Sequence, residues 1–586
     1  MKDLFRLFFV IFSLFFLVSC GGNEGDSSDE NEQNSGSDNV SVSLRVARDV
    51  DSSCAGMDFE CLTQYIGAIA FKITDGKGNI VFSKSVQRNE LKNLDKELTG
   101  IKNAENATLV VSVFLGEDMN TVKWQGKTTG LKFEKGKATK ATILLYPVAP
   151  REKEIPMPEQ LATARFGHSA TVLVDGRILV AGGFPSCGAN GKCIATESVE
   201  IIDMESGRIE TLVNMKERRA MHTAVALNDG SVLFIGGVQG FSAAQQETAF
   251  TDFPLLPYTQ NSAVTTIERY MPYYPKFNMR ENNPVMPIEN STETITVTLP
   301  GDTGSPFMAF QSILAKRISK NQTDVFLVGG IDENNVPSKK SYKLTVTETE
   351  DGTAPSITVS ELAESSSPLL LPALAYSGGS VLAVGGRPVA AEEKTTEEEN
   401  EGTEETETTA KTGVIASIIS ANESRDIEGD LNSNIFFTNS IAQDNVLYTL
   451  GGMPNKSGVL INSNQNVLRK WNPGDGSFQT PQNNNGLLTD GKSVVFAETL
   501  YNPDKNQISL IGGTDAENLY QIINASNLEV YDPPVSHRMT DRRIMPKASL
   551  IPAGIIGDRQ ILVITGGTSA LDSSGSASNT IKINIL

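Results

Sequence analysis

The sequence predicts an all-β protein in which a small sandwich of strands is followed by seven repeated units. The first observation is that seven Gly-Gly pairs recur along the chain, each at the end of a short apolar run. The second is that residues 40–147 alternate apolar and polar side chains in several stretches, as half-buried strands do. A repeat of this length is typical of an array of similar supersecondary units. The pairs are Gly182-Gly183, Gly236-Gly237, Gly329-Gly330, Gly385-Gly386, Gly451-Gly452, Gly512-Gly513 and Gly566-Gly567.

The chain begins with a segment that is typical of export. Lys2 and Arg6 precede an apolar stretch, residues 7–18, that is too short to span a bilayer as a helix. The stretch runs into Ser19-Cys20, which resembles the lipobox of a bacterial lipoprotein signal. The resemblance implies that residues 1–19 are removed as a signal peptide and that Cys20 is acylated, which anchors the protein to a membrane. The alternative is an ordinary secretory signal with an incidental cysteine.

Residues 20–39 are expected to be a disordered tether. After Cys20 this segment contains only Gly, Asn, Glu, Asp, Ser and Gln, so it cannot bury enough apolar surface to offset the entropy lost on ordering. Gly21, rather than Asp, follows the cysteine, which resembles the sorting signal of outer-membrane lipoproteins in Gram-negative bacteria. We therefore expect a lipid-anchored protein of the bacterial cell envelope, at the outer membrane.

The 586 residues carry a net charge of −20, with no basic stripe that would neutralise phosphates, so nucleic-acid binding is disfavoured. Cys54 with Cys61 and Cys187 with Cys193 form two close pairs, which predict two local disulfides in an exported chain. A metal site is the alternative. The spacings differ from Cys-x-x-Cys and no histidine lies near either pair, which disfavours zinc. No metal and no other cofactor is expected.

Residues 40–147 are predicted to form an Ig-like or transthyretin-like β-sandwich. Asp75-Gly-Lys-Gly78 predicts a turn between two of its strands. The alternating stretches that predict strands are residues 40–46, 66–73, 107–114 and 141–145. No group of residues in this domain points to chemistry.

The first two repeated units, Arg165–Gly183 and Arg219–Gly237, align without a gap at an offset of 54 residues. His168 and His222 occupy the same position in the two units. The last unit carries a parallel stretch in which Pro546 replaces the histidine. A residue that recurs with the unit more often serves the unit than a reaction, so we expect both histidines and the paired glycines to be structural.

Each unit can be divided into four strands. An apolar run is followed by a tight turn, often Asp-Gly, and by a second run that ends in Gly-Gly. Glycine suits that crowded strand end because it lacks a Cβ and tolerates positive φ. The third strands are predicted at residues 199–203, 267–270, 341–344, 467–471 and 528–532, and fourth strands at 209–213 and 295–299.

Four antiparallel strands in each unit of 50–60 residues are typical of a propeller blade, so seven pairs predict a seven-bladed β-propeller over residues 148–586. The last unit has only one strand after Gly567 and lacks its fourth. The segment around Glu154–Met157 is predicted to supply that strand and so to cover an exposed sheet edge.

These repeats resemble the bacterial kelch family within the galactose oxidase-like propellers, over residues 155–586. The sequence departs from the usual kelch pattern because it lacks a tryptophan late in each repeat; only Trp124 and Trp471 exist. Galactose oxidases hold copper with two tyrosines, two histidines and a tyrosine-linked cysteine. The only cysteines of the propeller region, Cys187 and Cys193, lie in one loop, so no residue here matches a copper ligand.

Two insertions interrupt the repeat. The first, at about 240–290, contains Phe250, Phe253, Tyr258, Tyr270, Tyr273, Tyr274 and Phe277. These aromatic side chains predict either a contact surface or a loop that covers a small core of its own. The second, at about 390–411, is rich in Glu and Thr and is expected to be disordered and solvated. The acidic stretch 426–432 resembles spaced calcium ligands but lacks the glycine and distal glutamate of an EF-hand.

The favoured function is recognition of an envelope protein or a glycan, without catalysis. The resemblance leaves open an enzyme, because some kelch propellers are sugar isomerases or oxidases, and that function requires a cluster of Arg, Glu or His at the channel mouth. His537, the third histidine, follows a Tyr-Asp-Pro-Pro turn and is expected to be exposed. A passive surface scaffold is the third alternative.

Overall fold

The computed structural model describes most of the chain from Val40 onward. The described residues are 40–46, 66–93, 98–115, 119–134, 137–149, 154–188, 192–243, 255–257, 263–274, 290–299, 304–334, 336–349, 352–386, 412–430, 435–436, 439–443, 445–450, 453–454, 468–480, 496–513, 520–531, 543–555, 559–569 and 576–586. The predicted signal peptide, the tether with Cys20, the Cys54–Cys61 pair, the acidic insertion and His537 lie outside these residues.

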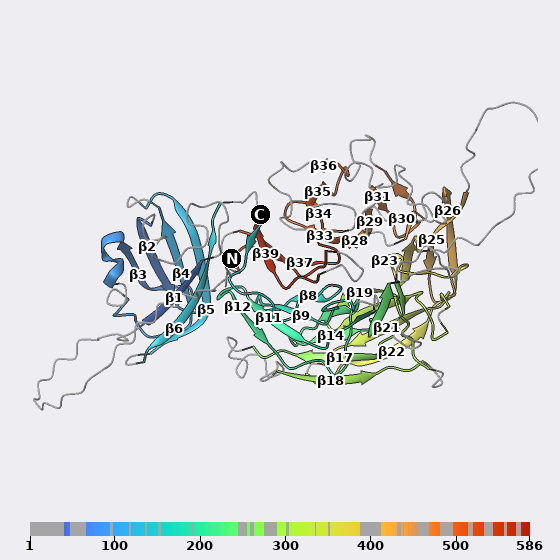
Figure 1. Ribbon diagram of the computed structural model, residues 1–586, viewed down its shortest axis with the longest axis horizontal. Coiled ribbons are helices and arrows are strands. Elements are labelled where there is room, and N and C mark those ends of the chain that lie inside the picture. Colours follow the sequence, from blue (N-terminus) through green and yellow to red (C-terminus); the bar gives the residue numbers. More distant parts are fainter. Residues whose placement is uncertain are drawn as a thin grey trace, which may run out of the picture.

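The described part is all-β, as predicted, and its strands form small sheets. The first sheet has six strands in the order β1-β6-β5-β4-β2-β3. Strand β1 runs parallel to β6, and the other neighbours are antiparallel. The strands are β1 (Val40–Val46), β2 (Ala68–Thr74), β3 (Ile80–Gln87), β4 (Ala104–Phe114), β5 (Val122–Phe133) and β6 (Thr139–Pro147), and a 3-10 helix η1 (Arg88–Asn93) follows β3. Figure 1 shows this N-terminal sheet at the left of the molecule.

Side chains alternate between the two faces along the strands of the N-terminal sheet, and one face forms a separate hydrophobic core. Ile69, Phe71 and Ile73 of β2 are buried, whereas Lys72 between them is exposed. Strand β6 divides its side chains in the same way: Ile143 joins this core, whereas Leu144 joins a second core shared with the repeated units. The predicted turn at residues 75–78 is present, with Gly78 N–H donating to Asp75 O over 2.9 Å.

Seven four-stranded antiparallel sheets follow within the described residues. The first four consist of β8 (Ser169–Val172), β9 (Ile178–Ala181), β11 (Val199–Asp203) and β12 (Arg208–Thr211); β13 (Thr223–Ala226), β14 (Val232–Ile235), β17 (Thr266–Met271) and β18 (Ser291–Thr296); β19 (Ser312–Ser319), β20 (Gln322–Val328), β21 (Ser341–Thr347) and β22 (Ser356–Glu361); and β23 (Ala373–Ser377), β24 (Ser380–Val384), β25 (Thr412–Ile419) and β26 (Ser424–Asp430).

The last three sheets keep the same strand order. They consist of β28 (Asn439–Gln443), β29 (Val446–Leu450), β31 (Leu468–Trp471) and β32 (Phe478–Gln479); β33 (Glu498–Asn502), β34 (Gln507–Ile511), β35 (Tyr520–Asn524) and β36 (Val530–Tyr531); and β37 (Lys547–Ile551), β38 (Ile561–Thr565), β39 (Ile581–Ile585) and β7 (Ile155–Pro156).

The first strands of these sheets contact one another in chain order. Strand β8 contacts β13, β13 contacts β19, and the series continues through β23, β28, β33 and β37. Strand β37 in turn contacts β8, so the cycle of neighbours returns to the first sheet. In Figure 1 the sheets accordingly follow one another around a common centre.

The last sheet is completed from the beginning of the repeated region, which confirms the predicted pairing of residues 154–157. Strand β7 pairs antiparallel with β39, with Ile155 opposite Ile583 and Pro156 opposite Lys582. We call the junction between this sheet and the sheet of β8 the seam.

Two strand predictions in the repeats were wrong in position. Residues 528–532 were expected to be a third strand, but β35 occupies that place and β36, within 528–532, is the fourth. The fourth strand of the second unit, β18, begins earlier than expected, at Ser291. The connections between strands vary in length between units: eight residues separate β34 from β35, whereas 17 separate β9 from β11, so periodicity alone does not fix where the next strand begins.

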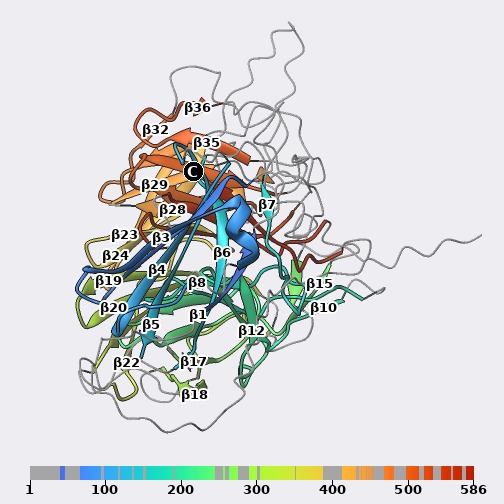
Figure 2. The same cartoon turned by 90° about the vertical axis from the view of Figure 1, so that its left-hand side faces the viewer.

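Loops of the repeated units form two further small sheets. β10 (Lys192–Ile194) pairs with β15 (Gly240–Ala243), which pairs with β16 (Leu255–Pro257), so this sheet joins loops of the first two units. β27 (Ile435–Phe436) pairs with β30 (Met453–Pro454). Figure 2 shows β10 and β15 together at one side of the molecule. The first insertion is therefore partly ordered as strand.

Candidate functional site

The paired glycines lie where one unit meets the next. In all six described pairs both glycines have φ between 61° and 110°, a left-handed conformation that disfavours other residues. A Cβ on Gly182 would lie 2.2 Å from Arg219 O in the next unit. The second glycine of that pair, Gly183, donates its N–H to the same carbonyl over 2.9 Å. Gly451-Gly452 lies outside the described residues.

Three arginines at one repeat position are fully buried: Arg165, Arg219 and Arg543. Each donates from Nη1 to the carbonyl of the first glycine of its own unit, over 2.7 Å to Gly182, 3.2 Å to Gly236 and 2.9 Å to Gly566. The guanidinium thereby fixes the end of the second strand from within the sheet.

In two of these units, a glutamate of the third strand forms an ion pair with the buried arginine. Arg165 Nη2 lies 2.5 Å from Glu200 Oε1, and both side chains are completely buried. The same carboxylate accepts N–H bonds from Ala162 over 2.5 Å and Thr163 over 3.1 Å. Burial lowers the pKa of Arg165, and the charge of Glu200 opposes that shift.

The second unit repeats the arrangement at a longer distance, with Arg219 Nη2 3.5 Å from Glu268 Oε2. Sequence reasoning aligned the arginines but missed their acidic partners. The signal was a glutamate in each of the two predicted third strands, Val199–Asp203 and Ile267–Tyr270.

The two aligned histidines are buried and bridge neighbouring sheets. His168 Nε2 lies 2.9 Å from Thr565 Oγ1 of the last sheet, and His222 Nε2 lies 2.9 Å from Ser169 Oγ of the first. Burial lowers the pKa of each imidazole well below 6.5, and nearby arginines lower it further. Neutral imidazoles in these positions connect neighbouring units.

A ring of apolar residues precedes the first strands. Gly167 and five large side chains each lie two residues before the first strand of a sheet, and all have φ between 46° and 62°. The five are Met221, Phe310, Leu371, Phe496 and Met545, and all belong to one hydrophobic cluster. We call these five residues the apolar ring. A left-handed backbone at bulky residues is strained, so the surrounding structure must impose it.

Backbone hydrogen bonds link three members of the apolar ring and Gly167 from sheet to sheet. Met545 N–H donates to Phe496 O over 2.9 Å, Gly167 N–H to Met545 O over 3.3 Å and Met221 N–H to Gly167 O over 2.7 Å. Sequence reasoning missed the apolar ring, because none of its five residues is of a type that signals positive φ.

One ion pair of titratable residues lies next to the apolar ring. Lys547 Nζ is 2.8 Å from Glu498 Oε2, and both residues begin the first strand of their sheets. The ammonium of Lys547 is also close enough to His168 and His222 to lower the pKa of both. The lysine side chain is 37% exposed and the glutamate 17%. The pair therefore places an ammonium group and a carboxylate in direct contact at a partly exposed position. Neither residue was singled out from the sequence.

In the sheet β10-β15-β16, which we call the loop sheet, a disulfide joins Cys193 of β10 to Cys187, which confirms one of the two predicted pairs. Cys193 is fully buried beside Phe184 and Phe241, whose rings meet edge to face with centroids 4.8 Å apart. Ile194, next to the disulfide, is 44% exposed.

The aromatic residues of the first insertion divide between core and surface. Tyr270 and Tyr274 are buried and Tyr273 is 42% exposed. Tyr270 OH donates to Val213 O over 2.5 Å, and Tyr274 OH donates to Gly230 O over 2.6 Å. The aromatic residues 250, 253, 258 and 277 lie outside the described residues.

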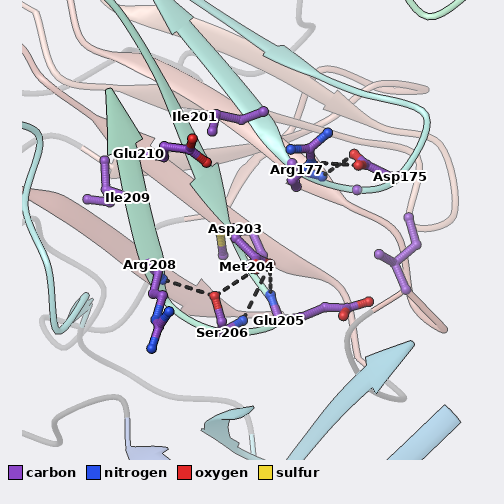
Figure 3. A pocket seen from close by; sticks show the side chains of 12 residues that line it. Asp175, Arg177, Ile201, Asp203, Met204, Glu205, Ser206, Arg208, Ile209 and Glu210 are labelled. Atoms are coloured by element: carbon purple, nitrogen blue, oxygen red, sulfur yellow. Dashed lines mark hydrogen bonds and ion pairs between the residues drawn. The ribbon is translucent and has the colours of Figure 1, made fainter. Parts of the chain in front are cut away.

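A pocket of about 340 Å³ lies at the turn ends of the first repeated sheet (Figure 3). Its walls combine Ile201, Met204, Ile209 and Ile555 with charged side chains. Arg177 Nε lies 2.5 Å from Asp175 Oδ2, and Arg208 and Glu210 are exposed. Glu205, another lining residue, accepts hydrogen bonds from the N-terminal sheet.

Nothing in the described ranges gathers three or more His, Cys, Asp or Glu side chains as metal ligands. The acidic stretch at 426–432 falls mainly on strand β26, where Asp426 accepts a hydrogen bond from Ser417 Oγ. The described part of the stretch therefore lies along a strand.

Comparison with known proteins found no matching family model and no matching curated protein. Over the described residues, no helix combines the length and the apolar character that crossing a membrane requires.

Proposed function

We propose that this protein is a non-enzymatic recognition module of the bacterial cell envelope. In this proposal the seven four-stranded sheets are the blades of a kelch-type β-propeller and the N-terminal sheet domain is an Ig-like or transthyretin-like sandwich. Acylated Cys20 anchors the chain to the outer membrane, and the tether of residues 20–39 holds both domains away from it. The ligand is an envelope protein or a glycan.

The loop sheet β10-β15-β16 is the observation that carries this proposal. It joins loops of two different units, and a disulfide fixes its first strand. The repeated units do not need the loop sheet to complete their fold, since each of the seven repeated sheets has its four strands without it. Ordered loops on a rigid scaffold are where binding residues are concentrated in proteins.

The buried charged residues of the repeats support the same proposal. Arg165, Glu200, Arg219 and Glu268 bond to backbone groups and to one another within their units. The histidines are neutral links between sheets. These groups hold the scaffold, which leaves recognition to its loops.

The proposal is tested with the chain that lacks residues 1–19, applied to a glycan array and used to capture proteins from envelope extracts. We expect one ligand class to bind the parent and to bind the Cys187→Ser/Cys193→Ser variant more weakly. Turnover of a sugar without any stable partner would overturn it. Membrane association that survives Cys20→Ser would overturn the proposed anchor separately.

A sugar-transforming enzyme is the second candidate, and the Lys547–Glu498 pair favours it. A lysine and a carboxylate 2.8 Å apart, both partly exposed, can exchange protons with a bound hydroxyl. Retention of binding with loss of turnover in Glu498→Gln would support this candidate. The Glu529→Gln variant, which alters an exposed carboxylate of the sixth unit, is the control.

A further inference from the structure

The N-terminal sheet contacts both sheets that meet at the seam. We propose that it is an intramolecular clamp, which holds the first and the last four-stranded sheets together through β5 and β6. The proposal concerns the stability of the scaffold and does not depend on which ligand the protein binds.

The last sheet is completed by β7, a strand of only two residues, as short as the fourth strands β32 and β36 of the two preceding sheets. Only two residue pairs join β7 to β39, whereas five join β39 to β38. Beyond β7 the chain continues along the last sheet, with Met157 N–H donating to Ile581 O and Leu161 N–H to Asn579 O, each over 2.9 Å. A strand of two residues contributes little to the cohesion of a sheet, so the seam depends on other contacts.

The clamp holds the first sheet through the turn between β11 and β12. Glu205 of this turn is 6% exposed. Its carboxylate accepts hydrogen bonds from Thr128 Oγ1 over 3.0 Å, Thr129 Oγ1 over 2.8 Å and Thr129 N–H over 3.1 Å. A buried carboxylate held by three donors is costly to separate from them.

Strand β6 holds the same turn by its backbone and by a tyrosine. Leu144 N–H donates to Glu205 O over 2.7 Å, and Tyr146 OH donates to Met204 O over 2.5 Å. A Cβ on Gly207 would come within 3.0 Å of Leu144, so a larger residue there would separate the two surfaces.

The clamp holds the last sheet through the turn between β37 and β38. Lys127 Nζ donates to Gly554 O over 2.7 Å. The next residue, Ile555, packs against the β8–β9 turn of the first sheet, where a Cβ on Gly176 would lie 2.5 Å from Ile555 Cγ2. The β37–β38 turn therefore contacts both the clamp and the first sheet, and Figure 1 shows β5 on the side of the N-terminal sheet toward β12.

One hydrophobic core passes through all three sheets. Leu144 and Tyr146 of β6 are 0% and 4% exposed in this core. Its other buried members come from the residues 155–161, from the first sheet and from the last: Ile155, Met157, Leu161, Ile178, Val180, Ile202, Met204, Ile551, Ile561, Val563, Ile581, Ile583 and Ile585. Opening the seam would expose apolar surface of the N-terminal sheet as well as of the two repeats.

At several other junctions between neighbouring sheets, side chains of the repeated units themselves form hydrogen bonds near the turns that connect the strands. Glu348 accepts from Asn228 N–H over 2.7 Å, Tyr448 OH donates to Ala525 O over 3.0 Å, and Asn502 Nδ2 donates to Gln560 Oε1 over 2.8 Å. At the seam, the N-terminal sheet supplies polar contacts of this kind to both sides.

Hydrogen exchange of the whole chain without residues 1–19 tests the clamp. The variant Thr128→Val/Thr129→Val removes two of the hydroxyl donors to Glu205. We expect at least about tenfold faster exchange in residues 154–161, 169–172 and 581–585, because local opening at the seam becomes less costly. Strands of the third to fifth repeats should exchange as in the parent. Thr139→Val is the matched control, since its hydroxyl donates only to Lys132 O of the same sheet, over 2.7 Å.

The clamp would be disproved if the turn at residues 203–208 lost protection while the seam exchanged at the parent rate. Indistinguishable exchange in the double variant and in Thr139→Val would disprove it equally. Should the double variant fail to fold, the Lys127→Met variant tests the clamp instead, because it removes only the hydrogen bond from Lys127 Nζ to Gly554 O. Faster exchange in residues 551–563 then supports the clamp, and parent rates there overturn it.

Discussion

His168 and Thr565 lie 397 residues apart in the chain, yet His168 Nε2 is 2.9 Å from Thr565 Oγ1. The bond connects the first repeated sheet to the last. His222 makes the corresponding bond one unit further on, to Ser169 Oγ. The two imidazoles therefore act as buried, neutral links between sheets, and their neutrality has a measurable consequence.

The first prediction concerns pH. Burial lowers the pKa of His168 and His222 well below 6.5, so the unfolded chain binds their protons more readily than the folded one. The free energy of unfolding therefore does not depend on them above about pH 6.5 and falls below it, by up to ~1.4 kcal/mol per pH unit for each histidine. Calorimetry between pH 7.5 and 5 should show a smaller loss of Tm in His168→Gln/His222→Gln than in the parent. Equal pH slopes would contradict this account.

The second prediction concerns the buried ion pair of the first repeat. Glu200→Ala leaves the guanidinium of Arg165 buried without its carboxylate, which should cost about 3–5 kcal/mol of unfolding free energy. Glu210→Ala, on the neighbouring strand and exposed, should change it by less than about 0.5 kcal/mol. Urea unfolding at pH 7 compares the two. Similar midpoints for both variants would show that the pair is not needed for stability.

The third prediction separates two reasons for glycine at the repeat position. Gly182 and Gly378 have similar φ, 63° and 55°, but a Cβ meets nothing within 4 Å at Gly378 and Arg219 O at 2.2 Å at Gly182. Gly378→Ala should therefore cost only the backbone term, about 1 kcal/mol. Gly182→Ala should cost at least about 2 kcal/mol more, because the next unit has to move. Equal losses in thermal unfolding would assign the glycine to backbone conformation alone.

The repeat was predictable because it obeys a period. The doublet glycines and the apolar runs before them gave the second strands, and a strand missing from the last unit pointed to residues 154–157. The predicted boundaries match the third strand of the first unit, Val199–Asp203. They differ for the fourth strand of the second unit, which begins at Ser291, because the connections between strands vary in length from unit to unit and the repeat does not fix that length.

The contacts between units were not predictable from the same pattern. Nothing in the residue types Met221, Phe310 and Leu371 signals a left-handed backbone; the surrounding sheets impose it. Glu205 is likewise an ordinary turn residue in the sequence, and only the arrangement of the N-terminal sheet brings Thr128 and Thr129 to its carboxylate. Local propensity determines strands, whereas these contacts arise when distant segments meet.

The last prediction concerns the strand that completes the final sheet. Ile155 is 2% exposed, pairs with Ile583 and lies in the core at the seam. Ile155→Ala should lower the unfolding free energy by about 2–5 kcal/mol, because it leaves a cavity where the first and last sheets meet. Ile80→Ala is the matched control: Ile80 begins β3 and is 60% exposed, so its removal should cost much less. Calorimetry of both variants shows whether β7 stabilises the junction between the first and last sheets or contributes nothing to its stability. A Tm of Ile155→Ala within a degree of that of Ile80→Ala would establish the latter, since a buried side chain cannot be truncated at the seam without loss if the seam depends on it.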